Sequence, residues 1–230
     1  MTQTSATLEW RNDVIPVSTK FDDPYYSLDS GLNETKHVFL SGNDLPNRFC
    51  DGFHIAELGF GTALNFLAAL DAWRESDQKG ALHFTSFEAY PMSVEDMQKA
   101  HAQFPEITPL AQECGPIWQS LLDTGTASGE DYHLKLIIGD AREMLKTWTG
   151  MADCWFLDGF SPAKNPELWE QEVLSEVGNH TVPNGTAATY TAAGFVRRNL
   201  EAAGFSVTRV QGYGRKRHMT QARKVDQHAE

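Results

Sequence analysis

Acidic side chains recur where four short apolar segments of the sequence end: Glu57, Glu88, Asp140 and Asp158. Glycines accompany three of the four. Carboxylate oxygens accept hydrogen bonds and can hold or stabilise a proton, and glycine lets a ligand approach the backbone closely. If the segments are parallel strands, their carboxyl ends meet along one edge of a sheet. The spacing therefore predicts one ligand site built from four strand ends.

The first two strand ends have the chemistry of a nucleoside site. Residues 57–62 read E-L-G-F-G-T, a turn typical of S-adenosylmethionine enzymes, and a helix pattern follows. Glu88 can accept hydrogen bonds from two ribose hydroxyls. A dinucleotide site would need a third glycine where Leu64 stands, so we favour S-adenosylmethionine. The predicted cofactor-binding residues are Glu57, Gly59, Phe60, Gly61, Thr62, Ala63, Glu88, Asp140 and Asp158.

Two of these acids have more than one interpretation. Asp140 can accept from an adenine amino group, or it can cap the helix that follows it. Asp158 precedes a loop stiffened by Pro162 and Pro166, which could hold an acceptor in line with a sulfonium or be a rigid connection without chemistry. We predict Asp158 as the catalytic residue.

The elements that must position these residues alternate between strand and helix. The patterns predict strands at 53–58, 82–87, 133–138, 155–157, 185–190, 206–210 and 218–223, and helices at 64–73, 93–103, 110–122, 166–177 and 193–203. This order predicts an α/β fold with a doubly wound, mostly parallel sheet. Residues 8–40 read as short strands and loops. We expect one domain over 1–230, with an N-terminal β-rich extension at 1–50 and a Rossmann-like core at 51–230.

Composition limits the remaining possibilities. The 230 residues carry three separated cysteines, no long apolar run, and neither a basic cluster nor an apolar core at the N-terminus. We therefore expect a cytoplasmic protein without a membrane segment or signal peptide. The eight histidines lack metal-site spacing, so no metal is expected. The sequence does not indicate an oligomeric state.

The charge is unevenly distributed. The net charge is −12, but residues 197–224 hold eight of the nineteen Lys and Arg and one acid, Glu201. Local basic density is what contacts phosphate. This segment therefore indicates a nucleic-acid partner, despite the negative net charge of the whole chain.

Four sequence runs resemble the methyltransferase domain of the MnmC family. They are residues 21–27 (FDDPYYS), 57–62 (ELGFGT), 155–166 (WFLDGFSPAKNP) and 191–198 (TAAGFVRR). The resemblance covers nearly the whole chain in order, without the flavin oxidase domain of the bifunctional enzymes, and so looks like a free-standing form. The family has Gly where Ala63 stands, and we expect Ala there to be tolerated only with a φ below zero.

The resemblance implies a reaction and a partner. The family finishes 5-methylaminomethyl-2-thiouridine at the tRNA wobble position, so the expected acceptor is the primary amine of 5-aminomethyl-(2-thio)uridine. Asp158 would then hydrogen-bond the amine and stabilise the ammonium that forms. The predicted substrate-binding residues are Tyr25, Tyr26, Lys164, Arg197, Arg198, Arg215, Lys216 and Arg217.

Simpler interpretations remain for several of these residues. Tyr25 and Tyr26 could pack the extension against the core, and Lys164 and the first two arginines could be solvated. A methyltransferase acting on a small amine would not need the basic segment. A non-catalytic cofactor- or RNA-binding module is the third alternative, although Gly61 and Asp158 favour an enzyme.

Overall fold

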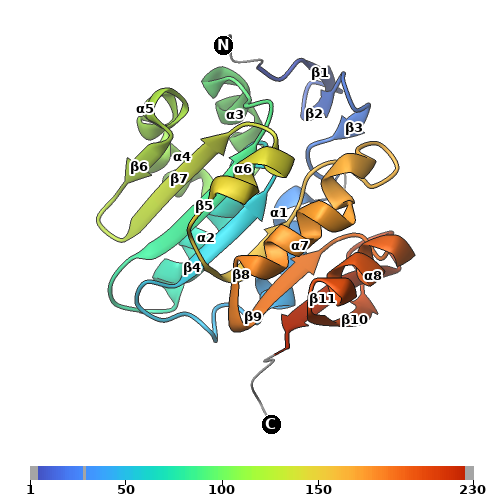
Figure 1. Cartoon of the computed structure of the whole chain (residues 1–230). Helices are drawn as coiled ribbons and strands as arrows, with labels where there is room; N and C mark the ends of the chain where they lie inside the picture. The colour runs from blue at the N-terminus through green and yellow to red at the C-terminus, as the bar shows by residue number, and fades with distance from the viewer. Residues whose placement is uncertain (1–4, 28–29, 226–230) are drawn as a thin grey trace.

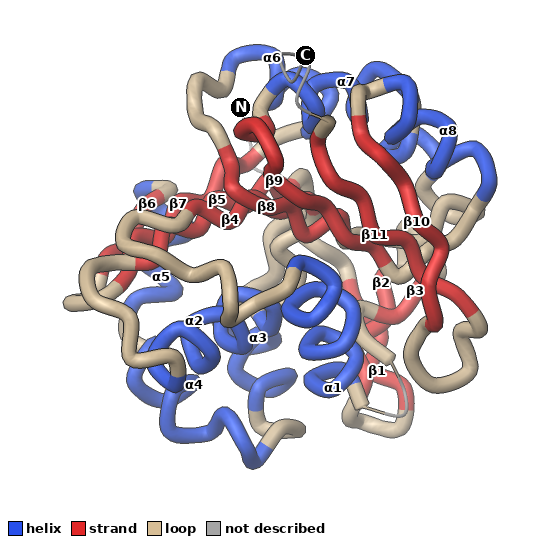
Figure 2. Tube along the Cα trace, turned by 90° about the horizontal axis from the view of Figure 1, so that it is seen from below, coloured by secondary structure: helices blue, strands red, loops and turns tan. Residues whose placement is uncertain are grey.

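Within residues 5–27 and 30–225, which the computed structural model describes, an eight-stranded sheet is covered by helices on both faces (Figures 1 and 2). The spatial order of its strands is β6-β7-β5-β4-β8-β9-β11-β10. The strands are β4 (His54–Leu58), β5 (Leu82–Glu88), β6 (Thr126–Ser128), β7 (Tyr132–Ile138), β8 (Ala152–Leu157), β9 (Thr181–Thr189), β10 (Phe205–Gln211) and β11 (His218–Lys224).

Five neighbouring strands, β7, β5, β4, β8 and β9, are mutually parallel. Strand β11 runs antiparallel to both of its neighbours, β9 and β10, and β6 is antiparallel to β7. The predicted α/β class with a mostly parallel sheet is confirmed.

The helices bury the two faces of the sheet in separate cores. They are α1 (Gly31–Thr35), α2 (Leu64–Glu75), α3 (Val94–His101), α4 (Thr108–Cys114), α5 (Ile117–Thr124), α6 (Ala141–Thr147), α7 (Gln171–Asn179) and α8 (Gly194–Ala202). Helices α1 to α5 cover one face and α6 to α8 the other. Side chains alternate across a strand, so Ile55 joins the first core and its neighbour Ala56 the second. Fully parallel strands need apolar residues on both faces, as β8 has.

The N-terminal extension is only partly the predicted β structure. Strands β1 (Leu8–Arg11), β2 (Ile15–Ser18) and β3 (Asp23–Pro24) form a small antiparallel sheet. The prediction of strands and loops is wrong for 31–40, which holds α1 and a π-helical turn. The Ser30 hydroxyl caps α1 by accepting from Asn33 N–H. Burial of Leu32 in the core near α2 then stabilises the helical turns.

Two predicted helices are also wrong in their extent. Residues 110–122 form two helices, α4 and α5, because Pro116 has no N–H to donate and its ring clashes with a preceding helical turn. The helix expected at 166–177 begins at Gln171, after a 3₁₀ turn at Pro166–Trp169. Strand β6 was not predicted. The other elements differ from prediction mainly at their ends.

The topological switch point lies between β4 and β8. The chain goes from β4 outward to β5 and β7, then returns to β8 on the other side of β4. Crossovers diverge at this point and leave a crevice at the carboxyl ends. The backbones of Gly59 and Gly159 approach each other closely there, because a Cβ on Gly59 would be only 2.9 Å from Gly159 Cα. Only glycine allows this approach.

The turn between β4 and α2 contains a left-handed alanine. Ala63 has φ +64° and is 1% exposed, which contradicts the expected negative φ. The alanine is accommodated because its surroundings hold the turn: the buried His101 ring nitrogen Nε2 is 2.6 Å from Thr62 O, and Ala63 N–H donates to Phe60 O. Such a φ costs a non-glycine residue on the order of 1 kcal/mol.

We predict that Ala63→Gly stabilises the protein by about 0.5–1 kcal/mol, because glycine adopts this φ without strain and loses only part of the gain to unfolded-chain entropy. For a domain of this size the melting temperature should rise by about 1–4 °C. The matched control is Ala202→Gly, at an exposed position of α8, which should lower the melting temperature. A lower melting temperature for both variants would contradict the inferred strain at Ala63.

In the described part of the chain, no helix has the length and apolar character needed to cross a membrane.

Candidate active site

A cavity of about 570 Å³ opens at the carboxyl ends of β4, β5, β7 and β8. It brings together most of the predicted site residues. Those in its wall are Gly59, Phe60, Gly61, Thr62, Glu88, Asp140, Asp158, Tyr25, Tyr26, Lys164 and Lys216. Those outside its wall are Glu57, Ala63, Arg197, Arg198, Arg215 and Arg217.

Glu88 presents its carboxylate to the cavity in a fixed orientation. One oxygen accepts from Gly61 N–H at 3.1 Å and the other from Tyr90 N–H at 2.8 Å. Burial raises the pKa of this carboxyl, although the backbone donors oppose the shift. Each oxygen keeps accepting capacity. Glu88 can therefore hold a ligand that offers two hydroxyl donors.

The glycine turn beside Glu88 leaves the backbone open to the cavity. Gly59 has φ +85° and Gly61 φ +51°. A Cβ on Gly61 would lie 3.2 Å from the Tyr25 ring. The turn, the carboxylate and the cavity volume fit the nucleoside and amino-acid parts of S-adenosylmethionine, which carries no phosphate for the turn to bind.

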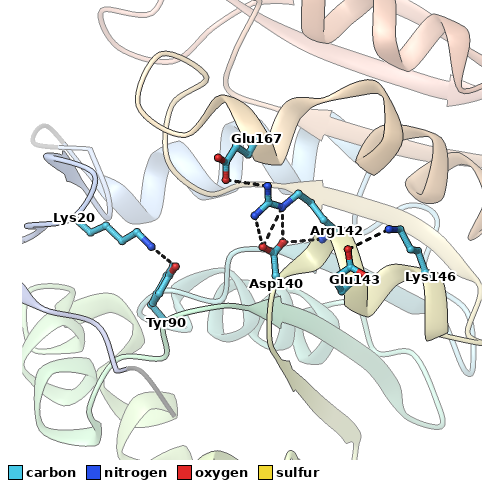
Figure 3. Close-up of polar contacts among 7 residues, drawn as sticks. All are labelled: Lys20, Tyr90, Asp140, Arg142, Glu143, Lys146 and Glu167. Atoms are coloured by element: carbon cyan, nitrogen blue, oxygen red, sulfur yellow. Dashed lines mark hydrogen bonds and ion pairs between the residues drawn. The ribbon is translucent and has the colours of Figure 1, made fainter. Parts of the chain in front are cut away.

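Asp140 caps α6 and is held by Arg142 (Figure 3). Its carboxylate accepts from Arg142 N–H at 3.0 Å and from the guanidinium at 2.5 Å. The guanidinium also pairs with Glu167 at 3.1 Å. These contacts hold the pKa of Asp140 below its usual range. The structure thus shows the capping contact, and the Arg142 guanidinium contacts both oxygens of the Asp140 carboxylate.

Asp158 belongs to a hydrogen-bond cluster that begins in the cavity wall and extends into the protein interior. The Asn65 amide donates to Asp158 Oδ2 and to Glu57 Oε1, each at 2.8 Å. The Ser86 hydroxyl donates to the other Glu57 oxygen at 2.6 Å, and Thr35 donates to Asn65 Oδ1 at 2.8 Å. Glu57 is 0% exposed. It supports the site from below and does not face a ligand.

Burial shifts the titration of both acids toward neutral pH. It raises the pKa of Glu57 to about 8 and that of Asp158 to about 7. Hydrogen bonds from Asn65 act in the opposite direction on both groups. At neutral pH Glu57 is mainly protonated, whereas Asp158 can exchange a proton. A group that titrates near the working pH suits acid–base chemistry.

The extension closes one wall of the cavity against the loop after β8. Phe160 stacks on Phe21 with ring centres 4.6 Å apart and meets Tyr25 edge-on at 5.0 Å. Ser161 N–H donates to Asp23 at 2.8 Å, and Lys164 pairs with Asp22 at 2.6 Å. Lys20 on the same extension reaches the Tyr90 hydroxyl across the cavity rim (Figure 3).

The predicted basic residues divide into two groups. Arg197 and Arg198 lie on α8, away from the cavity wall, and Arg197 Nε is buried without a hydrogen-bond partner. Residues 215–217 lie in the loop between β10 and β11, and of these Lys216 reaches the cavity. Its ammonium is 2.6 Å from Glu34 Oε1.

Sequence reasoning missed Asn65, Glu34, Tyr190, Arg142 and His101. Asn65 occupies an apolar-patterned helix, where a buried polar side chain was the available signal. The others contact the site through tertiary packing. Except for Arg142, whose partner Asp140 is two residues away, their partners lie far away in the sequence.

We predict that Glu57→Gln gains stability relative to the wild type as the pH rises. Glu57 has a folded pKa above its unfolded value, so the folded state binds more protons between about pH 4.5 and 8, and wild-type stability falls across that window. Each pH unit costs up to about 1.4 kcal/mol. Gln keeps the size and one accepting oxygen but has no proton to lose.

Thermal melts from pH 5 to pH 8.5 measure this difference. The melting temperatures of the two proteins should diverge steadily, while the exposed-site control Glu172→Gln should follow the wild type. Parallel curves for wild type and Glu57→Gln would contradict the buried, protonated Glu57.

Comparisons with known proteins agree with this site. A family model of S-adenosyl-L-methionine-dependent methyltransferases matches residues 106–225. The tRNA 5-methylaminomethyl-2-thiouridine biosynthesis bifunctional protein MnmC of Aeromonas hydrophila is 44% identical over 244 residues, covering 98% of this chain and 37% of that protein. The protein of the same name from Caulobacter vibrioides is 44% identical over 228 residues, covering 94% of this chain and 37% of its own length.

The chain thus spans little more than a third of these curated relatives. Among solved structures, MnmC2 from Aquifex aeolicus superposes with a TM-score of 0.78 at 25% identity, covering 98% of this chain and 71% of that one. Because the family model matches more than half of the chain, this chain belongs to the S-adenosyl-L-methionine-dependent methyltransferases.

Proposed function

We propose that this enzyme transfers a methyl group from S-adenosylmethionine to the primary amine of 5-aminomethyl-(2-thio)uridine at the wobble position of tRNA. The single observation that carries the proposal is the position of Asp158, a half-buried carboxylate that lines the cavity at the switch point of the sheet and accepts from the Asn65 amide at 2.8 Å. The names of the MnmC relatives support the substrate. The proposal places the enzyme in the cytoplasm, as one domain over 1–230 with 1–50 as an extension.

The cofactor assignments follow the cavity wall. Glu88 would accept from the two ribose hydroxyls, and the Gly59–Thr62 turn would lie along the ligand backbone. Asp140 would accept from the adenine amino group once Arg142 turns aside, a movement that its exposed side chain permits. Glu57 and Ala63 would shape the site without touching the ligand.

S-adenosylmethionine, when bound, supplies an electrophilic methyl group on a sulfonium. The work of this chain is to position the amine and to handle its protons. Only a neutral amine has the attacking lone pair, and a free alkylammonium titrates near 10. Asp158 Oδ1, the oxygen not bonded to Asn65, would accept an amine N–H, turn the lone pair toward the methyl and stabilise the positive charge as it forms.

The substrate assignments extend the site toward the surface. Arg215 and Arg217 flank Lys216 in the β10–β11 loop, which reaches the cavity rim, and we assign them to tRNA phosphates. Arg197 and Arg198 on α8 would extend the same basic surface. Lys164, Tyr25 and Tyr26 would border the acceptor nucleotide.

The direct test of this function uses labelled S-adenosylmethionine with tRNA that carries 5-aminomethyl-2-thiouridine. We expect label in 5-methylaminomethyl-2-thiouridine after nuclease digestion, and none in tRNA with an unmodified wobble uridine, because the latter has no amine. Methylation of small amines with no transfer to this tRNA would contradict the proposal.

We predict that Asp158→Asn lowers kcat about 10²–10⁴-fold with little change in cofactor affinity, because the negative charge matters most as the ammonium forms. The wild-type rate should also contain a step with a midpoint near pH 7, falling below it as Asp158 becomes protonated. This step should be missing in Asp158→Asn.

Single-turnover transfer at saturating tRNA and cofactor measures both effects. Asp153→Asn, at the opposite end of β8 where Asp153 accepts from His54 N–H, is the matched control and should keep wild-type turnover. If Asp158→Asn keeps both the rate and the pH step, Asp158 is not catalytic.

A further inference from the structure

The cavity wall contains a second charged group, on the side of the β10–β11 loop. The Lys216 ammonium is 2.6 Å from Glu34 Oε1 and 4.2 Å from the centre of the Tyr190 ring. Glu34 comes from α1, and Tyr190 directly follows the last residue of β9. All three residues line the same cavity as Asp158.

Within this group, the side chains of Glu34 and Tyr190 are held in place. The Glu34 side chain is 12% exposed. The Tyr190 hydroxyl donates to Gly159 O at 2.8 Å, which fixes the ring against the residue that follows Asp158. A carboxylate beside an aromatic face attracts an alkylammonium through charge and through the ring quadrupole.

Lys216 is the movable part. Its side chain is 44% exposed and extends from the loop that joins the edge strand β10 to its neighbour β11. A lysine side chain is itself a primary alkylamine. It therefore has the same chemistry as the acceptor in the proposed reaction.

We propose that Glu34 and Tyr190 form the subsite that recognises the substrate's primary alkylammonium, and that Lys216 occupies this subsite until the substrate replaces it. This proposal rests on the proposed function for the identity of the amine. Replacement of one ammonium by another keeps Glu34 paired throughout. An uncompensated buried carboxylate, which is costly, is thereby avoided.

The replacement of the Lys216 ammonium by the substrate ammonium also explains why Lys216 lies in a loop, between Arg215 and Arg217. tRNA docking on that loop would draw Lys216 outward while the amine enters. The subsite lies beside Asp158, so the captured ammonium is delivered to the carboxylate that handles its proton.

A thermal-shift experiment tests the subsite without tRNA or cofactor. Lys216→Ala removes three methylenes and the ammonium, which n-propylammonium can replace. At a tenfold excess over its dissociation constant, n-propylammonium chloride should raise the melting temperature of Lys216→Ala by about 3–5 °C. n-Propanol, which lacks the charge, should not.

Three variants serve as controls. Lys216→Met fills the subsite with an apolar chain and should not respond. Lys216→Ala with Glu34→Gln loses the carboxylate and should not respond. Lys146→Ala, which removes a lysine paired with Glu143 outside the cavity wall, should behave as wild type. An equal shift in all variants, or none in Lys216→Ala, would overturn the subsite and leave the pair as a structural tie.

A second measurement covers the case in which Lys216→Ala does not fold. Glu34→Gln should raise the KM for tRNA bearing 5-aminomethyl-2-thiouridine about tenfold, while its affinity for the same tRNA with an unmodified uridine is unchanged. Equal weakening of both would assign Glu34 to tRNA docking and refute amine recognition. If no tRNA is methylated but n-propylammonium still binds, the proposed function fails and the amine subsite stands.

Discussion

The Asn65 amide, which donates to both Glu57 and Asp158, is the interaction on which the site depends. Two buried carboxyls cannot both ionise at low cost in one region of low dielectric. A shared donor stabilises them, and their raised pKa values leave the deeper acid mainly protonated. The result is one carboxylate available to the cavity and a neutral support beneath it. Helix α2, which carries Asn65, begins directly after the glycine turn at 59–63, so one element positions both the turn and the donor that the two acids share.

The N-terminal extension holds the loop that follows Asp158 in place. Its aromatic residues pack on Phe160, and Asp23 holds the Ser161 backbone. The loop after Asp158 is therefore fixed from outside as well as by its own prolines. A stiff loop preserves the geometry between donor and acceptor in the proposed reaction, and such positioning can supply several kcal/mol, of the roughly 7–11 available to proximity.

The sequence predicted the fold class, the family and the strand-end acids, because strand alternation and glycine spacing are local signals. Family membership and the α/β sheet are confirmed. Pro116 is a local signal for a helix boundary that the prediction of one helix at 110–122 did not take into account; the structure has two helices there. Ala63 shows the opposite case, because its left-handed φ depends on contacts such as the one from His101 to Thr62, which lies 39 residues away.

The charged contacts of the site were beyond sequence reasoning for the same reason. Lys216 and Glu34 are 182 residues apart, and neither stands in a recognisable motif. Glu57 belongs to the glycine-turn motif, yet its side chain points into the core because side chains alternate along β4. Sequence spacing thus located the site, whereas the side-chain partners follow from how the elements pack.

Carbon-13 NMR of the labelled Asp and Glu carboxyls, followed from pH 3 to pH 10, tests the central claim most directly. The shared amide and the burial of both acids predict two carboxyl signals that titrate as a coupled pair, with midpoints near 7 and 8. The Glu57→Gln and Asp158→Asn variants should each lack one of them. If every carboxyl titrates near 4, as exposed acids do, the buried pair and the chemistry built on it are refuted.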